Sequence, residues 1–219
     1  MIKCQSVSGL LSSHRMGTLK EKVVLITGAG KGSGGLLARA FAEGGSFVAA
    51  NDISPINVEE VVNQIVAKGG YAKTYIEDIA KKVGAQNIIN QVEDDFGPID
   101  ILINHAAVEP HIPLLEMDEW DWHRTLDVNL TGAFLMTQSV GRVMRAQGSG
   151  VIINLISAST QFGKNGAAFL ASMDGLEGLT RQAAQEFAPH GIKVYAIENI
   201  QEKIVERVFA LLELQKEPR

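Results

Sequence analysis

The sequence predicts an α/β fold in which a parallel β-sheet lies between two layers of α-helices, and two observations support this prediction. Short, continuous apolar runs recur along the chain, and such runs are typical of strands buried on both faces. They lie at residues 23–26, 47–50, 101–103, 151–156 and 192–197. The segments between them carry apolar residues at the 3.6-residue period of a helix. This alternation indicates repeated βαβ units, and therefore a three-layer, doubly wound sheet that we expect to contain six strands.

The segments between the runs carry apolar stripes, each of which is expected to face the sheet. The stripes consist of Val58, Val61, Val62, Ile65 and Val66; of Ile88, Ile89, Val92 and Phe96; of Leu126, Leu130, Phe134 and Met144; and of Leu176, Leu179, Ala183 and Phe187. A further helical pattern, with Ile204, Val205, Val208, Leu211 and Leu212, follows the last apolar run.

Composition and charge narrow the class of protein. Of the 219 residues, 46% are hydrophobic and 21% are charged, and the net charge is −5. Binding to nucleic-acid phosphates needs a basic surface, so no nucleic-acid partner is expected. No apolar run approaches the ~20 residues of a membrane span. No metal site is expected. The single cysteine, Cys4, favours a reducing, cytoplasmic setting. Residues 1–18 are polar and aperiodic, which predicts a disordered N-terminal extension before a single domain at 19–219.

A glycine-rich segment follows the first predicted strand and opens the first predicted helix. Turns of this kind let backbone N–H groups approach a pyrophosphate closely, and the helix N-terminus supplies partial positive charge. A flexible loop would have a similar composition, but the position between a strand and a helix favours a Rossmann-type dinucleotide site. The candidate cofactor-binding residues in this segment are Gly28, Gly30, Lys31, Gly32, Ser33 and Gly34.

Asp52 ends the second predicted strand, at roughly the 20-residue spacing after the glycines that is typical of an acidic residue bonded to the adenosine ribose. A carboxylate there would repel a 2′-phosphate, so NAD(H) is favoured over NADP(H). Two observations leave the preference open. Asp52 precedes Ser54-Pro55 and could be a turn or N-cap residue, and Lys31 could bind a phosphate.

From about Leu19 to Ile197 the chain resembles the short-chain dehydrogenase/reductase family. The segment Thr27-Gly-x-x-x-Gly32-x-Gly34 matches the cofactor motif of that family, except that Ser33 replaces the usual isoleucine or leucine. The resemblance implies that Asp78, with Ile79 beside it, contacts the adenine. It also implies an NAD(P)-dependent oxidoreductase acting on a small carbonyl or alcohol substrate.

The segment after the fourth strand of the family also has a counterpart here. Asn104 and Ala106 match the first and third residues of the family's Asn-Asn-Ala-Gly, whereas His105 and Ala107 depart from it. The resemblance implies that Asn104 and Ala106 lie at the cofactor site.

Two residues of the family's catalytic set are retained, and two are replaced. Asn129 matches the helix asparagine that holds a water of the proton relay, and Ser157 matches the serine that hydrogen-bonds the substrate oxygen. Phe169 and Met173 occupy the positions of the tyrosine and lysine of the family's Tyr-x-x-x-Lys motif. The phenol supplies the proton and the ammonium lowers its pKa, so a phenyl ring and a thioether predict weak or absent catalysis. The nearby polar alternatives in sequence order are His105, His111 and Lys164.

The C-terminal part also departs from the family. The sixth strand leads through Glu198-Asn199-Ile200 directly to the final helix, so the substrate-covering segment and the last strand of the family are expected to be absent. The sheet would then expose an edge unless the final helix or a partner covers it. The helices around residues 117–147 and 166–188 correspond to the dimer face of the family, so a homodimer is expected.

Three interpretations of function follow. The first is an NAD(H)-binding protein without dehydrogenase activity that acts as a partner or sensor. The second is an active oxidoreductase with an atypical proton donor. The third is a truncated family member that acts only through protein contacts.

Overall fold

The computed structural model describes residues 19–157 and 166–213, in which six parallel strands form one sheet. The strands are β1 (Val23–Thr27), β2 (Phe47–Asp52), β3 (Tyr71–Ile76), β4 (Ile101–Asn104), β5 (Gly150–Ile156) and β6 (Ile192–Glu198). Their order in the sheet is β3-β2-β1-β4-β5-β6. The predicted doubly wound α/β fold is confirmed. The expected extension at residues 1–18 lies outside the described residues.

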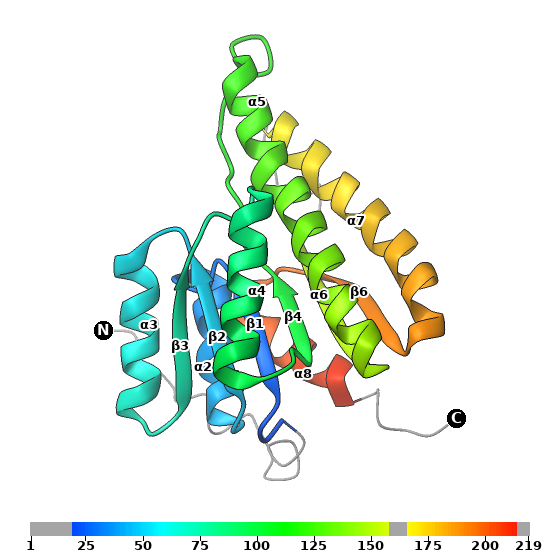
Figure 1. Cartoon of the computed structure of the whole chain (residues 1–219). Helices are drawn as coiled ribbons and strands as arrows, with labels where there is room; N and C mark the ends of the chain where they lie inside the picture. The colour runs from blue at the N-terminus through cyan, green and yellow to red at the C-terminus, as the bar shows by residue number, and fades with distance from the viewer. Residues whose placement is uncertain (1–18, 158–165, 214–219) are drawn as a thin grey trace.

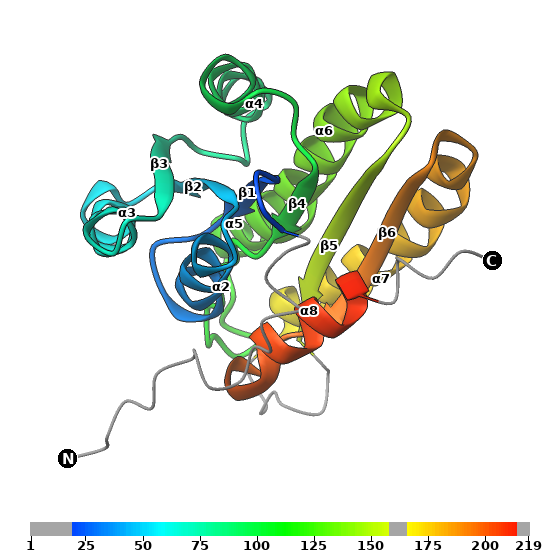
Figure 2. The same ribbon diagram turned by 90° about the horizontal axis from the view of Figure 1, so that it is seen from below.

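Helices cover both faces of this sheet (Figure 1). They are α2 (Gly32–Glu43), α3 (Pro55–Ala67), α4 (Lys82–Phe96), α5 (Glu119–Leu126), α6 (Ala133–Gln147), α7 (Ala167–Phe187) and α8 (Ile204–Glu213). One apolar cluster joins the sheet to α2, α3 and α8, and a second joins it to α4, α6 and α7. The view in Figure 2 looks across these layers from below.

The apolar stripes explain which helix face is buried, with one main correction. Val58, Val61, Val62 and Ile65 are buried as predicted, whereas Val66 is exposed. In the third stripe Met144 is buried, but Phe134 is 40% exposed. The exposure of Phe134 is explained by a π-helical segment, η2 (Asp127–Gly132), between α5 and α6. The wider π turn shifts the helix phase, so a stripe drawn at a constant 3.6-residue period across it cannot keep to one face.

Strand β3 lies at one edge of the sheet and has no continuous apolar run. Its burial alternates, with Tyr75 buried and Tyr71 and Ile76 exposed. Tyr75 is tied to α4, since its hydroxyl donates to Asp95 at 2.9 Å.

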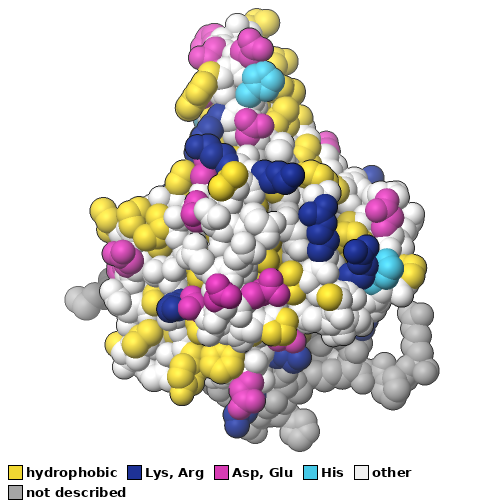
Figure 3. Space-filling model, in the orientation of Figure 1, with side chains coloured by type: hydrophobic (Ala, Val, Ile, Leu, Met, Phe, Trp, Pro, Cys, Tyr) yellow, Lys and Arg dark blue, Asp and Glu magenta, His cyan; other side chains and the backbone are white. Residues whose placement is uncertain are grey.

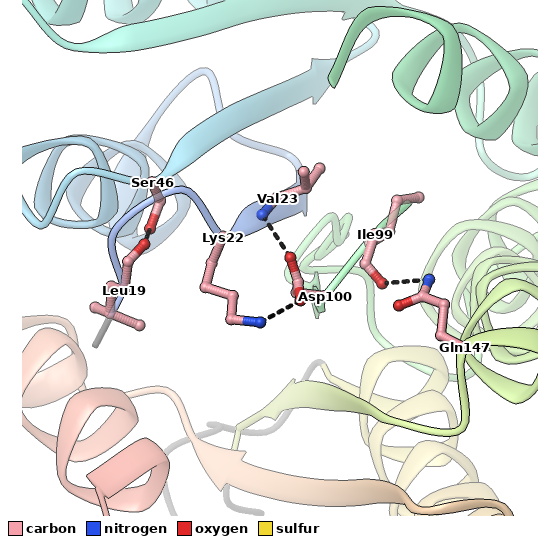
Figure 4. Close-up of polar contacts among 7 residues, drawn as sticks. All are labelled: Leu19, Lys22, Val23, Ser46, Ile99, Asp100 and Gln147. Atoms are coloured by element: carbon pink, nitrogen blue, oxygen red, sulfur yellow. Dashed lines mark hydrogen bonds and ion pairs between the residues drawn. The ribbon is translucent and has the colours of Figure 1, made fainter. Parts of the chain in front are cut away.

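The amino ends of the strands are joined by polar contacts (Figure 4). Asp100, just before β4, accepts from the Lys22 Nζ atom at 2.6 Å and from the Val23 backbone N–H at 2.9 Å. Ser46, before β2, donates to the Leu19 carbonyl at 2.8 Å. These bonds hold together the starts of β1, β2 and β4 at the amino edge of the sheet.

The final helix packs on the face of the sheet next to α2. Its Phe209 ring lies edge-on to Phe41 of α2, with centroids 5.0 Å apart. Arg207 donates to the carbonyl of Glu198 at 3.1 Å, which ties α8 to the end of β6. Among the described residues no strand pairs with the outer edge of β6, so α8 covers a face of the sheet and leaves that edge open.

The surface is mixed in character. Acidic and basic side chains are interspersed on the face drawn in Figure 3, and apolar side chains appear on the projecting region around α5. The exposed apolar residues there include Leu114, Leu115 and Trp120.

None of the helices in the described part of the chain is long and apolar enough to cross a membrane.

Candidate functional site

The strand order changes direction at β1, with β2 and β3 on one side of it and β4, β5 and β6 on the other. Hydrogen bonds join the carboxyl ends of β1 and β4. Thr27 Oγ1 accepts from the backbone N–H groups of His105 at 3.1 Å and Ala106 at 3.2 Å. Gly28 follows with a φ of 66°, and a Cβ there would lie 2.7 Å from the Ala106 Cα. A crevice at this point of a doubly wound sheet is the usual position of a bound nucleotide.

The glycine-rich turn opens α2 in a way that suits a phosphate. Lys31 is the N-cap residue, and no side chain caps the helix. The first N–H groups of α2 therefore remain available to an anion, at the positive end of the helix dipole. Gly34 must be glycine for packing reasons, because a Cβ there would overlap the Gly28 carbonyl oxygen and the His105 ring. The turn fits the pyrophosphate of a dinucleotide.

A cleft of about 490 Å³ lies above the carboxyl ends of the strands. Its lining includes nine of the predicted site residues: Gly28, Lys31, Gly32, Asp52, Asp78, Ile79, Ala106, Ser157 and Phe169. Gly30, Ser33, Gly34, Asn104, Asn129 and Met173 are not part of the lining. All six of these residues are buried.

Asp52 has a double role in shaping the cleft. Its Oδ2 accepts from the Gly30 backbone N–H at 3.0 Å, and its Oδ1 accepts from the Ser54 N–H at 2.9 Å. The second bond is the turn interaction considered as an alternative. An ionised carboxylate has about four acceptor sites, so Asp52 keeps capacity for ribose hydroxyls.

Asp78 and Ile79 form the wall beyond β3. Asp78 Oδ1 accepts from the Ala80 N–H at 3.0 Å, and Ile79 is buried against Gly132 of the π turn. The pair presents an apolar and an acidic surface to the same end of the cleft as Asp52.

Asn104 belongs to a buried polar chain beneath the cleft. Its Nδ2 donates to Asn154 Oδ1 at 2.8 Å and to Thr137 Oγ1 at 3.1 Å. Asn154 in turn donates to Thr180 Oγ1 at 2.8 Å. This chain links β4, β5, α6 and α7, so Asn104 positions the strand end from below.

Asn129 lies in the π turn and is almost fully buried. Its Oδ1 accepts from the Val108 N–H at 2.8 Å, and its Nδ2 donates to the Val108 carbonyl at 3.0 Å. Nδ2 also donates to Ser172 Oγ on α7 at 3.0 Å. Asn129 therefore fixes the segment after β4, which forms one wall of the cleft.

The two positions that the sequence comparison predicted to correspond to the family's tyrosine and lysine are apolar and packed. Phe169 lines the cleft together with Ser157, although only 4% of it is exposed. Met173, one turn later on α7, is also 4% exposed. Neither side chain has an O–H or N–H group to give a proton, so Ser157 is the retained polar residue at this end.

His105 is held under the glycine-rich turn. Its Nδ1 lies 3.0 Å from the Gly28 carbonyl, and a carbonyl can only accept, so Nδ1 carries the proton. Burial lowers the pKa of His105 below its usual 6.5, against smaller opposing contributions from the backbone of Gly28 and Thr27 and from Asp52. The ring is therefore neutral near pH 7, with an unprotonated Nε2. His111 is exposed and lies 3.6 Å from Glu109, while Lys164 lies outside the described residues.

The structure adds residues to the cleft that sequence reasoning missed. These are Ile53, Ser54, Asn57, Glu77, Val108, Glu109, Arg124, Val128 and Asn199. Three of them adjoin a predicted site residue in the sequence: Ile53 follows Asp52, Glu77 precedes Asp78, and Val128 precedes Asn129. Asn199 carried no local signal.

Across residues 19–157 and 166–213 there is no group of three or more His, Cys, Asp or Glu side chains that could hold a metal ion.

The comparisons with known proteins agree with this geometry. The family model for short chain dehydrogenases matches residues 22–199. An uncharacterized oxidoreductase of Thermotoga maritima is 40% identical over 177 residues, which are 80% of this chain and 70% of that protein.

Two solved structures show the same fold with a nucleotide. NAD⁺-bound xylitol dehydrogenase has a TM-score of 0.78 and 34% identity, and the match covers 82% of this chain and 70% of the other. A metagenomic short-chain oxidoreductase in complex with NADP has a TM-score of 0.83 and 30% identity, with 89% and 91% covered.

The sheet order, the glycine-rich turn and the cleft define a nucleotide-binding α/β protein of the Rossmann type. The chain belongs to the short-chain dehydrogenase family. Its structural neighbours bind NAD in one case and NADP in another.

Proposed function

We propose that this protein binds NAD(H) at the cleft and that its hydride-transfer chemistry is impaired. The binding part is supported by the uncapped start of α2, by the close packing of Gly28 and Gly34, and by the acidic wall of Asp52 and Asp78. When bound, the dinucleotide would supply or accept the hydride. The glycine-rich turn would hold its pyrophosphate, and Asp52 would bind the adenosine ribose.

The proposal that catalysis is impaired is supported by one observation, the presence of Phe169 and Met173 at these two positions. Reduction of a carbonyl needs a proton at the forming alkoxide, and a positioned acid is typically worth about 10²–10⁴-fold in rate. Ser157 can hydrogen-bond a substrate oxygen, but among the residues that the structure describes no tyrosine or lysine lines the cleft except Lys31 of the glycine-rich turn. A small carbonyl or alcohol could therefore bind without efficient conversion.

His105 is a poor substitute acid for a physical reason. Its one proton at neutral pH is on Nδ1 and is donated to Gly28, so the free Nε2 can only accept. His111 is exposed and pairs with Glu109. The alternative, an active oxidoreductase with an atypical donor, is favoured only by the active relatives of this chain.

The preference for NAD(H) over NADP(H) is supported by Asp52. Its carboxylate lies at the cleft surface, where a 2′-phosphate would meet a like charge. Lys31 lines the same cleft, so a direct comparison of the two cofactors is needed.

The first experiment is a calorimetric titration of the purified chain with NADH and with NADPH. We expect saturable binding with NADH the tighter ligand, and no turnover on a panel of carbonyls and alcohols. Gly34→Ala should abolish binding, because its methyl group overlaps the Gly28 carbonyl. Gly178→Ala is the matched control, since its methyl group would have only Arg181 within 4 Å, at 3.9 Å.

Two results would contradict the proposal. Absence of binding to either cofactor would leave a fold that acts through protein contacts alone. Robust turnover that is lost in Ser157→Ala would show an active enzyme.

A homodimer in the cytoplasm is part of the proposal. The exposed Phe134 on α6 and Trp120 on α5 give an apolar surface to the helices that correspond to the dimer face of the family. Sedimentation should show a dimer that Phe134→Glu dissociates and that Val66→Glu, at an exposed apolar site on α3, leaves intact. A monomeric wild type would contradict this part.

A further inference from the structure

Ser33 and Asn199 are joined across the molecule at the edge of the cleft. The Ser33 hydroxyl, in the first turn of α2, donates to Asn199 Oδ1 at 2.6 Å, although 166 residues separate the two. Asn199 follows β6, and its backbone N–H donates to the Ile156 carbonyl at the end of β5, at 2.7 Å. Asn199 is therefore held through both its side chain and its backbone.

The bond with Ser33 determines which way the amide of Asn199 faces. Ser33 is only 2% exposed, so its hydroxyl needs a protein acceptor, and Asn199 Oδ1 is that acceptor. The NH₂ group of Asn199 then points away from Ser33. Among residues 19–157 and 166–213 no acceptor is bonded to Asn199 Nδ2, although Asn199 lines the cleft. Two fixed N–H donors are therefore available to a ligand.

The place of Asn199 in the sheet selects the part of the ligand that it can reach. Asp52 and Asp78 follow β2 and β3, on one side of the switch between β1 and β4. Asn199 lies on the other side, bonded to Ser33 in the first turn of α2 and to the carbonyl of Ile156 at the end of β5. The adenosine is assigned to the first side, so the nicotinamide half extends toward the second.

We propose that Asn199 is a cofactor-binding residue whose Nδ2 donates to an oxygen in the nicotinamide half of the bound dinucleotide, in an orientation fixed by Ser33. This inference rests on the proposed binding of NAD(H). The competing explanation is that the Ser33–Asn199 bond only tethers the start of the C-terminal segment to α2.

Asn199→Asp separates these explanations. An aspartate keeps an oxygen that accepts from Ser33, so the tether survives, but it replaces the NH₂ group with a negatively charged oxygen. Asn199→Leu has similar size and no charge, and it removes the donors together with the tether. Asn90→Asp, an exposed position on α4, makes the same change of net charge away from the cleft.

The test is a titration of the full chain and these variants with two probes, NADH and AMP, together with melting temperatures. We expect Asn199→Asp to melt like the wild type and to bind NADH at least about tenfold more weakly, because a donor is exchanged for a like charge. AMP, which lacks the nicotinamide half, should bind within about twofold of the wild type in Asn199→Asp and Asn199→Leu.

Each other outcome overturns the inference. NADH affinity in Asn199→Asp equal to that of Asn90→Asp would mean that Asn199 is only a tether. An equal loss for NADH and AMP would mean a general distortion of the cleft. If the wild type binds NADH no more tightly than AMP, the contact with the nicotinamide half is refuted but a nucleotide site remains. If the wild type binds neither probe, the proposed function is refuted as well.

Discussion

Asn129 donates a hydrogen bond to Ser172 at 3.0 Å, and this bond joins the π turn to the helix that carries Phe169. Ser172 Oγ in turn donates to the Phe169 carbonyl at 2.6 Å. Asn129, which the sequence comparison matched to the family's asparagine, is thus bonded to the turn of α7 that holds Phe169. Asn129 has a structural role here that does not depend on a proton relay.

The first prediction concerns the stability that Asn129 provides. Asn129→Ala should lower the free energy of unfolding by about 2 kcal/mol, because the Val108 backbone groups and Ser172 lose their partner. Urea denaturation measures this. Asn90→Ala, at an exposed site on α4, should change the same quantity by less than about 0.5 kcal/mol. Equal effects of the two substitutions would contradict the structural role.

The second prediction concerns restoration of the family's catalytic pair. The double variant Phe169→Tyr with Met173→Lys should gain little turnover on a carbonyl and alcohol panel. Met173 is buried, so a lysine there either loses its charge or destabilises the fold. Only residues 199–203 lie between β6 and α8, so no long segment between these elements shields the cleft from water.

Phe169→Tyr alone is the control for folding. Phe169 lines the cleft, and this substitution adds one hydroxyl without placing a charge in the core, so the melting temperature should change less than in the double variant. A large gain in turnover by the double variant would show that the rest of the site is intact and that these two residues alone limit the chemistry.

The third prediction uses the lowered pKa of His105. The unfolded chain takes up a proton at this residue below pH 6.5, but the folded chain does so only at lower pH. The unfolded state therefore binds more protons in this interval, and stability falls as the pH drops from about 6.5 toward the folded-state pKa. His105→Asn should flatten this part of the stability profile. An unchanged slope in chemical denaturation between pH 7 and 5 would exclude His105 as its source.

The fourth prediction concerns cofactor preference. Asp52→Asn removes the negative charge but keeps one oxygen that can accept from Gly30 or Ser54. The preference for NADH over NADPH should fall by about tenfold or more, mainly because NADPH binds better. Calorimetric titration with both cofactors measures this. Asp94→Asn on α4 makes the same change of charge away from the cleft, and an equal shift in that variant would contradict the role of Asp52.

The fold could be predicted from the sequence mainly where burial is continuous. Strands β1, β2, β4 and β5 lie inside the sheet and are apolar runs because helices cover them on both faces. Strand β6 lies at an edge, and its run is interrupted by the exposed Lys193. Strand β3 is an edge strand with alternating burial, so its apolar signal is weak and its presence was implied only by the number of strands expected. The π turn was also missed, because its hydrogen-bond pattern depends on local packing around Asn129 rather than on residue periodicity.

The candidate site shows the same limit. The glycine-rich turn and Asp52 were predicted from their places at the ends of strands, and Ser157 was predicted from the resemblance to the family. All three line the cleft because strand ends meet at one edge of a parallel sheet. Asn199 also follows a strand, but its importance depends on Ser33, which is distant in the sequence. The family pattern marked Ser33 as unusual, yet only the folded chain shows what its hydroxyl contacts.

The last prediction concerns the packing of α8 on α2, which brings the C-terminal segment to the cofactor helix. Phe209 is 3% exposed and meets Phe41 edge-on, so Phe209→Ala should lower the free energy of unfolding by about 3 kcal/mol through lost burial and a residual cavity. Leu115→Ala removes a fully exposed apolar side chain and should cost less than about 0.5 kcal/mol. Because Asn199 lies between β6 and α8, Phe209→Ala should also weaken NADH binding by a few fold at temperatures where the variant is folded. If Phe209→Ala unfolds with the same free energy as the wild type, α8 is not docked on α2 in solution. If the variant is clearly destabilised but binds NADH with normal affinity, the position of Asn199 does not depend on α8.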